Sequence, residues 1–413
     1  MTLKRAFWIL GIAGLIPLAI GLYIRLVMGR ELTNLGSIVP WGLWIAQYIY
    51  LAGLSAGAYV VSALVYVFHV ERLEPIGRLA VFAAIVSLPL GLLAVLLDLG
   101  HWERFWYVAA FWNLSSPMAW MILLYSAFMV VVLIQFWFLM RRDLVAARST
   151  PGWRGRVAGV LALGSRETSD AGASRDARVV AVLARIGLVL AVLFPTMVGG
   201  LFGVVSSRSY WYSGLFPVVF ALSAVASGAA LLALVSSIFQ DGWRAHRDLI
   251  VTLGKILLGL LFLELLLQAA EIGVGLYAND PAFHESVMLV MFGPYWFVFW
   301  IGEVAIGFLI PVAILASSLG RDPRFVALAA LGSLVGFVGL RLNIVIPGLS
   351  PQEIAGLSEA VWDPRVSPNY FPSLFEWLLA IGMVGLWLVL FGLGELFLPL
   401  GREHPVAPQP SEA

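Results

Sequence analysis

Polar and ionisable side chains gather where the third long apolar stretch of the sequence ends. The segment 96–106 reads Leu-Leu-Asp-Leu-Gly-His-Trp-Glu-Arg-Phe-Trp, so Asp98, His101 and Trp102 are close neighbours, and Ser116 opens the next apolar stretch. A carboxylate and an imidazole beside aromatic rings can accept a hydroxyl proton, pass it on and hold a flat ring. The pattern predicts a site for a hydroquinone; the alternative is an ordinary interfacial loop with an aromatic belt.

The second apolar stretch carries further polar side chains at helical spacing. Tyr48, Ser55 and Tyr59 fall on one face of a helix. Tyr48 lies about seven residues, roughly 10 Å, from the end of this stretch. Gly53 and Gly57 are four residues apart, a spacing that lets a neighbouring helix approach closely. We therefore expect a polar slot between packed helices, at the same level as Asp98.

Ionisable residues also lie deep in apolar stretches of the second half. Glu264, Gln268 and Glu271 follow each other at i, i+4 and i+7, and Glu303 and Arg341 occur in later stretches. Charged groups inside a membrane are costly, so they mark either structural pairs or a proton path. The sequence leaves both interpretations open.

The composition indicates that lipid is the main solvent of the chain. Of the 413 residues, 61% are hydrophobic and 12% are charged, with a mean hydropathy of +0.95, whereas a soluble domain is about half apolar and about a quarter charged. In lipid the backbone must be satisfied within helices or a closed barrel, and the unbroken apolar runs exclude barrel strands. The sequence predicts an all-α integral membrane protein.

Apolar runs of about 20 residues predict about ten transmembrane helices. A weak repeat of small residues relates 51–58 to 221–229, and each copy opens a set of four helices. This suggests two four-helix bundles with flanking first and tenth helices, although tight helix packing alone explains part of the likeness. The predicted helices are 6–28, 41–68, 77–99, 116–140, 179–203, 214–239, 248–276, 290–318, 324–345 and 373–399. The predicted segments are 1–40 with the first helix, 41–203 with the first bundle and a solvated loop at 141–178, 214–345 with the second bundle, an ordered cap loop at 346–372, and 373–413 with the tenth helix and a tail.

The basic residues predict the orientation in the membrane, because cytoplasmic loops carry most Lys and Arg. With both termini cytoplasmic in the inner membrane, 19 of the 25 basic residues fall on the cytoplasmic side. The remaining six are Arg25, Arg30, Arg104, Arg208, Arg341 and Arg365.

The residue types limit which cofactors the chain itself can hold. The chain has no cysteine, so it can hold no iron–sulfur cluster of its own, and we predict no metal site. Its five histidines lie near predicted helix ends, in loops or in the tail, which disfavours a haem held between two helices. Nothing in the charge distribution points to nucleic acid. Redox centres are therefore expected in partner subunits.

Three segments resemble the NrfD family of membrane subunits of polysulfide, tetrathionate and related reductases. They are 40–59, from Pro40-Trp-Gly-Leu-Trp to Ala-Gly-Ala-Tyr59, then Leu-Asp-Leu-Gly at 97–100 and Ser-Ser-Pro-Met at 115–118. The predicted ten helices are similar to the longer branch of that family rather than to the eight-helix polysulfide reductase type. In polysulfide reductase-like members a histidine on the helix that matches the second helix of this chain contacts the quinone. Tyr48 stands at that position here, so Tyr48 or Gln47 would replace it.

The resemblance implies a menaquinol or ubiquinol site near the outer face, without haem. It also implies a ferredoxin-like iron–sulfur subunit on that face, which serves a catalytic subunit of the molybdopterin type. The expected quinone-binding residues are Gln47, Tyr48, Ser55, Tyr59, Asp98, His101, Trp102 and Ser116. The expected proton path comprises Asp98, Glu264, Gln268, Glu271, Glu303 and Arg341.

A proton-coupled secondary transporter is the alternative from another functional class. Transporters also contain internal repeats and buried carboxylates, but their sites are formed by broken helices near the middle of the membrane. The polar cluster around Asp98 instead lies near one surface, which favours the oxidoreductase subunit.

Overall fold

The computed structural model describes residues 3–239, 242–352, 354, 356–360, 363–398 and 400. Over these residues the chain is all-helical, and ten helical segments are long and apolar enough to cross a membrane. The predicted all-α membrane fold with ten spans is confirmed. The predicted tail from Gly401 lies outside the described residues.

The helices follow one another without a strand between them in the described part of the chain. The first half contains α1 (Leu3–Met28), α2 (Leu43–Tyr66), η1 (Glu71–Ile76), α3 (Gly77–Asp98), η2 (Trp102–Arg104), α4 (Tyr107–Ala110), α5 (Pro117–Ala147), α6 (Trp153–Leu161) and α7 (Asp170–Gly203). The second half contains α8 (Phe216–Ile238), η3 (Gly242–Arg244), α9 (Arg247–Tyr277), α10 (Pro281–Phe292), η4 (Val298–Leu309), α11 (Ile310–Ala316), η5 (Ser318–Arg321), α12 (Pro323–Leu349), α13 (Leu357–Ala360), η6 (Pro364–Val366) and α14 (Leu374–Phe397).

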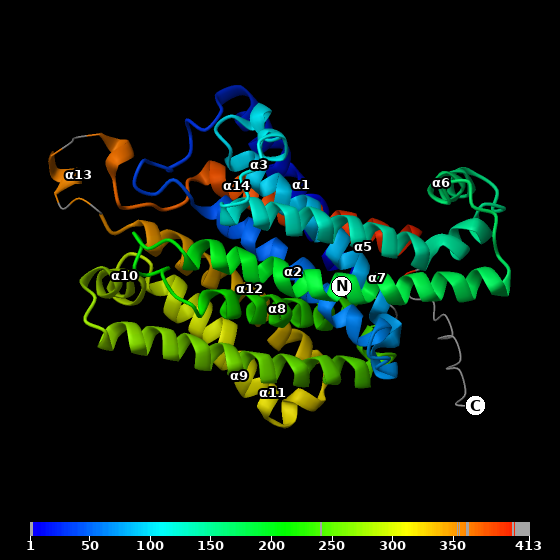
Figure 1. Cartoon of the computed structure of the whole chain (residues 1–413). Helices are drawn as coiled ribbons and strands as arrows, with labels where there is room; N and C mark the ends of the chain where they lie inside the picture. Colours follow the sequence, from blue (N-terminus) through cyan, green and yellow to red (C-terminus); the bar gives the residue numbers. More distant parts are fainter. Residues whose placement is uncertain are drawn as a thin grey trace.

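The bundle has two distinct ends. Figure 1 shows α10 and α13 at one end and α6 at the other. We call the first the cap end; it carries the connections 29–42, 99–116, 278–297 and 350–373. The connection 350–373 is tied to 29–42, because Ser37 N donates to Arg365 O at 2.6 Å.

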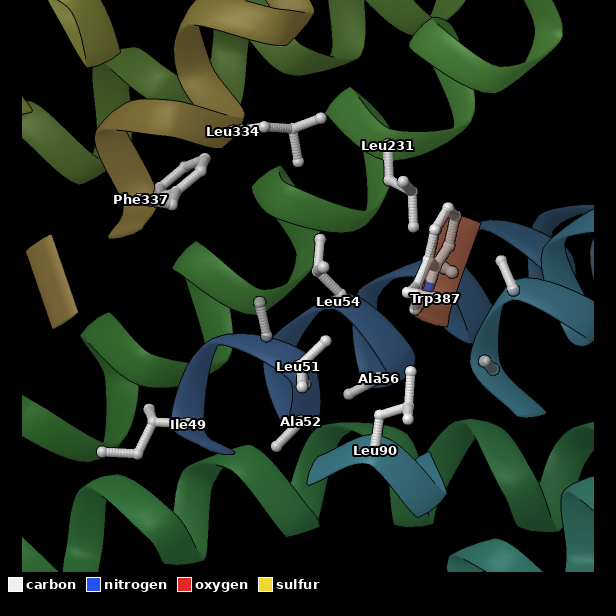
Figure 2. Packing of buried hydrophobic residues seen from close by; sticks show 14 of the residues in the cluster. Ile49, Leu51, Ala52, Leu54, Ala56, Leu90, Leu231, Leu334, Phe337 and Trp387 are labelled. Carbon is white, nitrogen blue, oxygen red and sulfur yellow. The ribbon is translucent and has the colours of Figure 1, made fainter. Parts of the chain in front are cut away.

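Helix α2 lies at the centre of the packing and contacts α3, α7, α8, α12 and α14. Figure 2 shows its apolar side chains among Leu90 of α3, Leu231 of α8, Phe337 of α12 and Trp387 of α14. Five polar side chains of α2 are buried among these helices, namely Gln47, Tyr48, Ser55, Tyr59 and Ser62. The central position of α2 explains why so many of its side chains are buried.

The predicted small-residue contact of α2 is confirmed, and its partner is α8. A Cβ atom added to Gly57 would lie 1.8 Å from the Ala224 carbonyl oxygen, and one added to Gly228 would lie 2.0 Å from the Gly57 carbonyl carbon. The two small-residue segments that resemble each other in sequence are thus packed against each other. The division of the chain into two four-helix bundles stays a prediction.

Helices α1 and α14 form an antiparallel pair at the side of the bundle. A Cβ atom on Gly14 would lie 2.6 Å from Gly385 Cα, and one on Gly382 would lie 2.5 Å from Leu18 Cα. Glycine at these positions allows the two backbones to approach closely. The other face of α1 is largely exposed, as expected for a lipid-facing helix.

Two segments differ from the sequence prediction. The predicted solvated loop 141–178 is mostly helical, because α5 continues to Ala147, α6 follows, and α7 already starts at Asp170. A buried ion pair between Arg141 and Asp176, 2.5 Å apart, holds the two long helices together there. These helical parts are rich in polar residues, so long apolar runs do not predict them.

The predicted helix 290–318 is also interrupted. Helix α10 ends at Phe292, and after Gly293 and Pro294 a π-helical segment, η4, leads into α11. Proline lacks a backbone donor and glycine is flexible, so this dipeptide ends one helix before the next begins.

Candidate functional site

Asp98 is the last residue of α3 and is buried at the cap end, with 7% of its surface exposed. Its Oδ1 lies 4.0 Å from Arg30 Nη2, an ion-pair distance too long for a hydrogen bond, and Oδ1 has no hydrogen-bond partner among the described residues. Arg25 of α1 instead donates to the carbonyl oxygens of Leu97 and Leu99, at 2.9 and 2.6 Å. A buried carboxylate oxygen therefore remains able to accept a hydrogen bond.

The wall beside Asp98 is formed by the start of α14. Ser373 and Glu376 make a capping box, in which each side chain accepts a hydrogen bond from the other residue's backbone N–H. Tyr370 donates to Glu376 and accepts from Leu43 N at 3.0 Å. Burial, and next the negative charge of Glu376, raise the pKa of Tyr370, so this phenol keeps its proton and acts as a donor.

Gln47 of α2 faces the same helix one turn deeper. Its Nε2 donates to the Ala380 carbonyl oxygen at 2.9 Å, while its buried Oε1 has no partner among the described residues. Ala380 follows Glu376 by four residues, and Asp98 is within electrostatic range of Glu376. Asp98 and Gln47 thus each keep one buried acceptor without a partner among the described residues.

Tyr48 points to another side of α2, toward α3 and α5. A Cβ atom on Gly91 would lie 3.6 Å from its ring, its hydroxyl contacts Met121 Sδ at 3.5 Å, and the Tyr125 ring is 6.4 Å away. Because Tyr48 is level with Gly91, Asp98 lies seven residues, about 10 Å, nearer the cap end. Tyr125 was missed in the sequence because it sits singly in an apolar run.

Ser55 and Tyr59 lie deeper on α2 and already have partners. Ser55 donates to the Ala84 carbonyl oxygen at 3.0 Å, and Tyr59 donates to Gln135 and to Leu183 O. These partners belong to α3, α5 and α7, so both side chains are used in contacts between helices. Gln135, buried in the middle of α5, was not singled out in the sequence.

The expected convergence of Asp98, His101 and Trp102 with Tyr48 at one depth is wrong. Asp98 lies about 10 Å nearer the cap end than Tyr48, and the other two residues lie in the connection beyond it. The His101 side chain is 68% exposed in the connection after α3 and lies 2.9 Å from Glu103 Oε1. Trp102 is half exposed, and Ser116 precedes α5 without a side-chain capping bond. Only Asp98 of the 96–106 segment is a polar residue buried in the bundle, because α3 ends there and the chain leaves the apolar region.

A second polar cluster lies inside the second half of the chain. Arg341 of α12 donates to Ser223 Oγ at 2.5 Å and stacks 4.8 Å from the Phe220 ring. Asn343 donates to Glu303 of η4 at 2.6 Å, and both Glu303 and the fully buried Glu264 are within electrostatic range of Arg341. Arg341 is thus buried inside the bundle, as its place in a late apolar stretch predicts.

The cluster extends toward the cap end. Ser213 donates to Glu271 at 2.9 Å, and Tyr210 is within electrostatic range of both Glu271 and Glu303. Gln268 lies between Glu264 and Glu271 on the same face of α9. Of the six residues of the expected proton path, Asp98 thus lies at the end of α3, whereas the other five lie on α9, η4 and α12 in the second half of the chain.

Fold and site together define a polytopic helical membrane protein with two buried polar clusters. Among the residues described, no group of three or more His, Cys, Asp or Glu side chains could hold a metal ion. The chain belongs to the polysulphide reductase NrfD family, whose model matches residues 31–351. That match contains both clusters' central helices but neither α1 nor α14.

Curated relatives extend over almost the whole chain. A selenate reductase subunit of Mesobacillus selenatarsenatis is 36% identical, with 97% of this chain and 95% of the relative covered. A putative dimethyl sulfoxide reductase membrane subunit of Halobacterium salinarum is 30% identical, with 98% and 94% covered. The Hdr-like menaquinol oxidoreductase integral membrane subunit of Archaeoglobus fulgidus is 27% identical, with 94% and 92% covered.

Proposed function

We propose that this chain is the quinone-reactive membrane subunit of a respiratory reductase complex. Relatives named as subunits of selenate and dimethyl sulfoxide reductases and of a menaquinol oxidoreductase support a role in such a complex. They favour it over a secondary transporter. Menaquinol or ubiquinol is the proposed substrate. The protein is proposed to lie in the inner membrane with its cap end facing outward.

The observation that carries the proposal is the pair of unpaired buried acceptors, Asp98 Oδ1 and Gln47 Oε1. A polar oxygen buried without a partner costs about 1–3 kcal/mol, which a hydroxyl of a bound hydroquinone would recover. Oxidation of one hydroquinone releases two protons and two electrons. Asp98 would accept the two protons one after the other, and exposed His101, three residues on, is the proposed outlet for each.

The neighbouring aromatic rings supply the remaining contacts in this proposal. Tyr48 and Tyr125 form a tilted pair next to Gly91, about 10 Å deeper than Asp98. Such rings suit the apolar ring and the start of the prenyl chain. Ser55, Tyr59, Trp102 and Ser116 are further from this centre, and we give them supporting roles in packing and at the entrance.

Electrons leave toward partners at the cap end in this account. A ferredoxin-like iron–sulfur subunit docked there would collect them and pass them to a catalytic subunit, for which a molybdopterin enzyme is the proposed type. If protons and electrons both leave at the cap end, quinol oxidation moves no net charge across the membrane. Energy conservation would therefore need the second cluster, where Arg341 can neutralise only one of Glu264 and Glu303 and the other can carry a proton.

The proposal is tested by quinol oxidation with the complex purified through this chain. Asp98→Asn keeps the size of the side chain but removes the base, and we expect the rate to fall about 100-fold or more. Glu31→Gln, an exposed acid in a cap-end connection, is the matched control and should keep the wild-type rate. Equal, inhibitor-insensitive rates in Asp98→Asn and wild type would disprove the site.

A further inference from the structure

The α1–α14 pair makes polar contacts with the two helices that carry the proposed quinone site. Besides the Gln47 bond to Ala380, Trp44 Nε1 donates to the Glu376 carbonyl oxygen at 3.1 Å, and Trp387 Nε1 donates to Ser87 Oγ at 2.9 Å. All these bonds are buried. They join α14 to α2 and α3, which a loosely attached lipid-facing helix would not need.

Arg25 makes the corresponding contact from α1. It is 7% exposed, and its two bonds reach the carbonyl oxygens on either side of Asp98 in sequence. The last carbonyls of a helix have no partner within the helix, and an arginine can satisfy them. Because the guanidinium is used for the backbone, the Asp98 carboxylate is not paired with it.

This arrangement has a consequence for the acceptor. Had Arg25 bound the carboxylate directly, it would have taken up part of the acceptor capacity of Asp98 that a hydroxyl group could otherwise use. Instead, Arg25 fixes the end of α3, and Arg30 stays 4.0 Å from Oδ1. The carboxylate is held in place with one oxygen free.

We propose that the α1–α14 pair, which lies outside the family-matched segment, is part of the quinone site, and that Arg25 is its positioning residue. The pair forms the wall opposite the α2–α3 face and holds Asp98 in the geometry that receives the quinol hydroxyl. The inference rests on the proposed function. It assigns a role in substrate binding to helices that would otherwise serve only as an anchor.

The test compares Arg25→Gln and Arg25→Lys in the purified complex, with kinetic constants normalised to assembled complex. For Arg25→Gln we expect the KM for a soluble quinol and the Kd of a headgroup inhibitor to rise together about tenfold, equal to about 1.4 kcal/mol. Arg25→Lys keeps the charge but lacks the planar fork that bonds two carbonyls, so its KM should rise by a smaller factor. Arg104→Gln, an exposed cap-end arginine, should change neither constant.

The outcomes separate this inference from the proposed function. If Asp98→Asn abolishes turnover while both Arg25 variants keep KM and Kd within twofold of wild type, Arg25 has no positioning role. If Asp98→Asn is also without effect, the quinone site itself is misplaced. Should Arg25→Gln fail to assemble, the Arg25→Lys constants decide the matter.

Discussion

The charged side chains of the second cluster are buried, and keeping them inside the bundle costs free energy unless they are paired. Arg341, Glu264 and Glu303 are each at most 2% exposed, so bulk water screens their charges little. One arginine faces two carboxyl groups, and removing one partner of a buried pair usually leaves an uncompensated charge. The cluster should therefore be strongly coupled.

Arg341→Leu tests this coupling. We expect the single variant to lose about 3–5 kcal/mol of stability, because two acids then lie together in a low dielectric. Adding Glu264→Gln should restore part of the loss, since the remaining acid has Asn343 as a donor. Thermal unfolding in detergent, followed by the fluorescence of the 16 tryptophans, measures the stability of the single and of the double variant. A double variant no more stable than Arg341→Leu would contradict the coupling.

The sequence predicted which helix carries each polar side chain, but neither its depth relative to residues of other helices nor its direction around the helix could be predicted. Gln47 and Tyr48 are consecutive, so they point about 100° apart and meet α14 and α5 respectively. Which neighbour lies on which side is set by packing. Arg25 was therefore counted only among the six basic residues off the cytoplasmic side, with no partner predicted for it. Glu376 was not singled out, although Ser373-x-x-Glu376 is a capping-box pattern.

At the scale of elements, the approach of α2 to α8 positions both clusters relative to each other. Gly57 and Gly228 leave no room for a side chain between the helices. Just one turn away, Gly53 lies where an added Cβ would be 3.7 Å from Arg341 Nη2. A change in this contact should thus disturb both halves of the chain.

We expect Gly57→Leu to prevent this approach. Forcing a large side chain into a filled contact costs about 1–3 kcal/mol, and more where the neighbour is backbone, as it is here. Gly259→Leu, on a part of α9 with open space around it, is the matched control and should keep the wild-type melting temperature. Equal melting temperatures for the two variants would show that the α2–α8 contact is looser than described.

Elements were predictable from the sequence where they are apolar throughout, and less so where polarity intervenes. The ten spans follow from long apolar runs, because lipid demands them. The helical parts of 141–178 escaped because they are rich in Arg and Ser, and their helical form depends on contacts such as Arg141 with Asp176. The start of η4 was shifted by the Gly293–Pro294 break.

For the whole molecule, the distribution of charge predicts that the cap end faces outward and the α6 end faces the cytoplasm. Because the chain has no cysteine, single cysteines can report this without a background. Ser115→Cys at the cap end should react with a membrane-impermeant maleimide in intact cells, and Ser149→Cys beyond α5 should react only after the membrane is broken. The reverse labelling pattern would show that the cap end faces the cytoplasm, and the proposed docking face would then lie on the cytoplasmic side.

The central claim is that a quinol headgroup binds under the cap end between α2, α3 and α14. Photo-crosslinking of the purified complex with a headgroup-azido quinone, followed by peptide mapping, tests it most directly. We predict label in the peptides that contain Gln47, Tyr48 and Asp98, and its loss when excess unlabelled quinol competes. Competed label confined to α9, η4 and α12 would contradict the account and move the site to the second cluster.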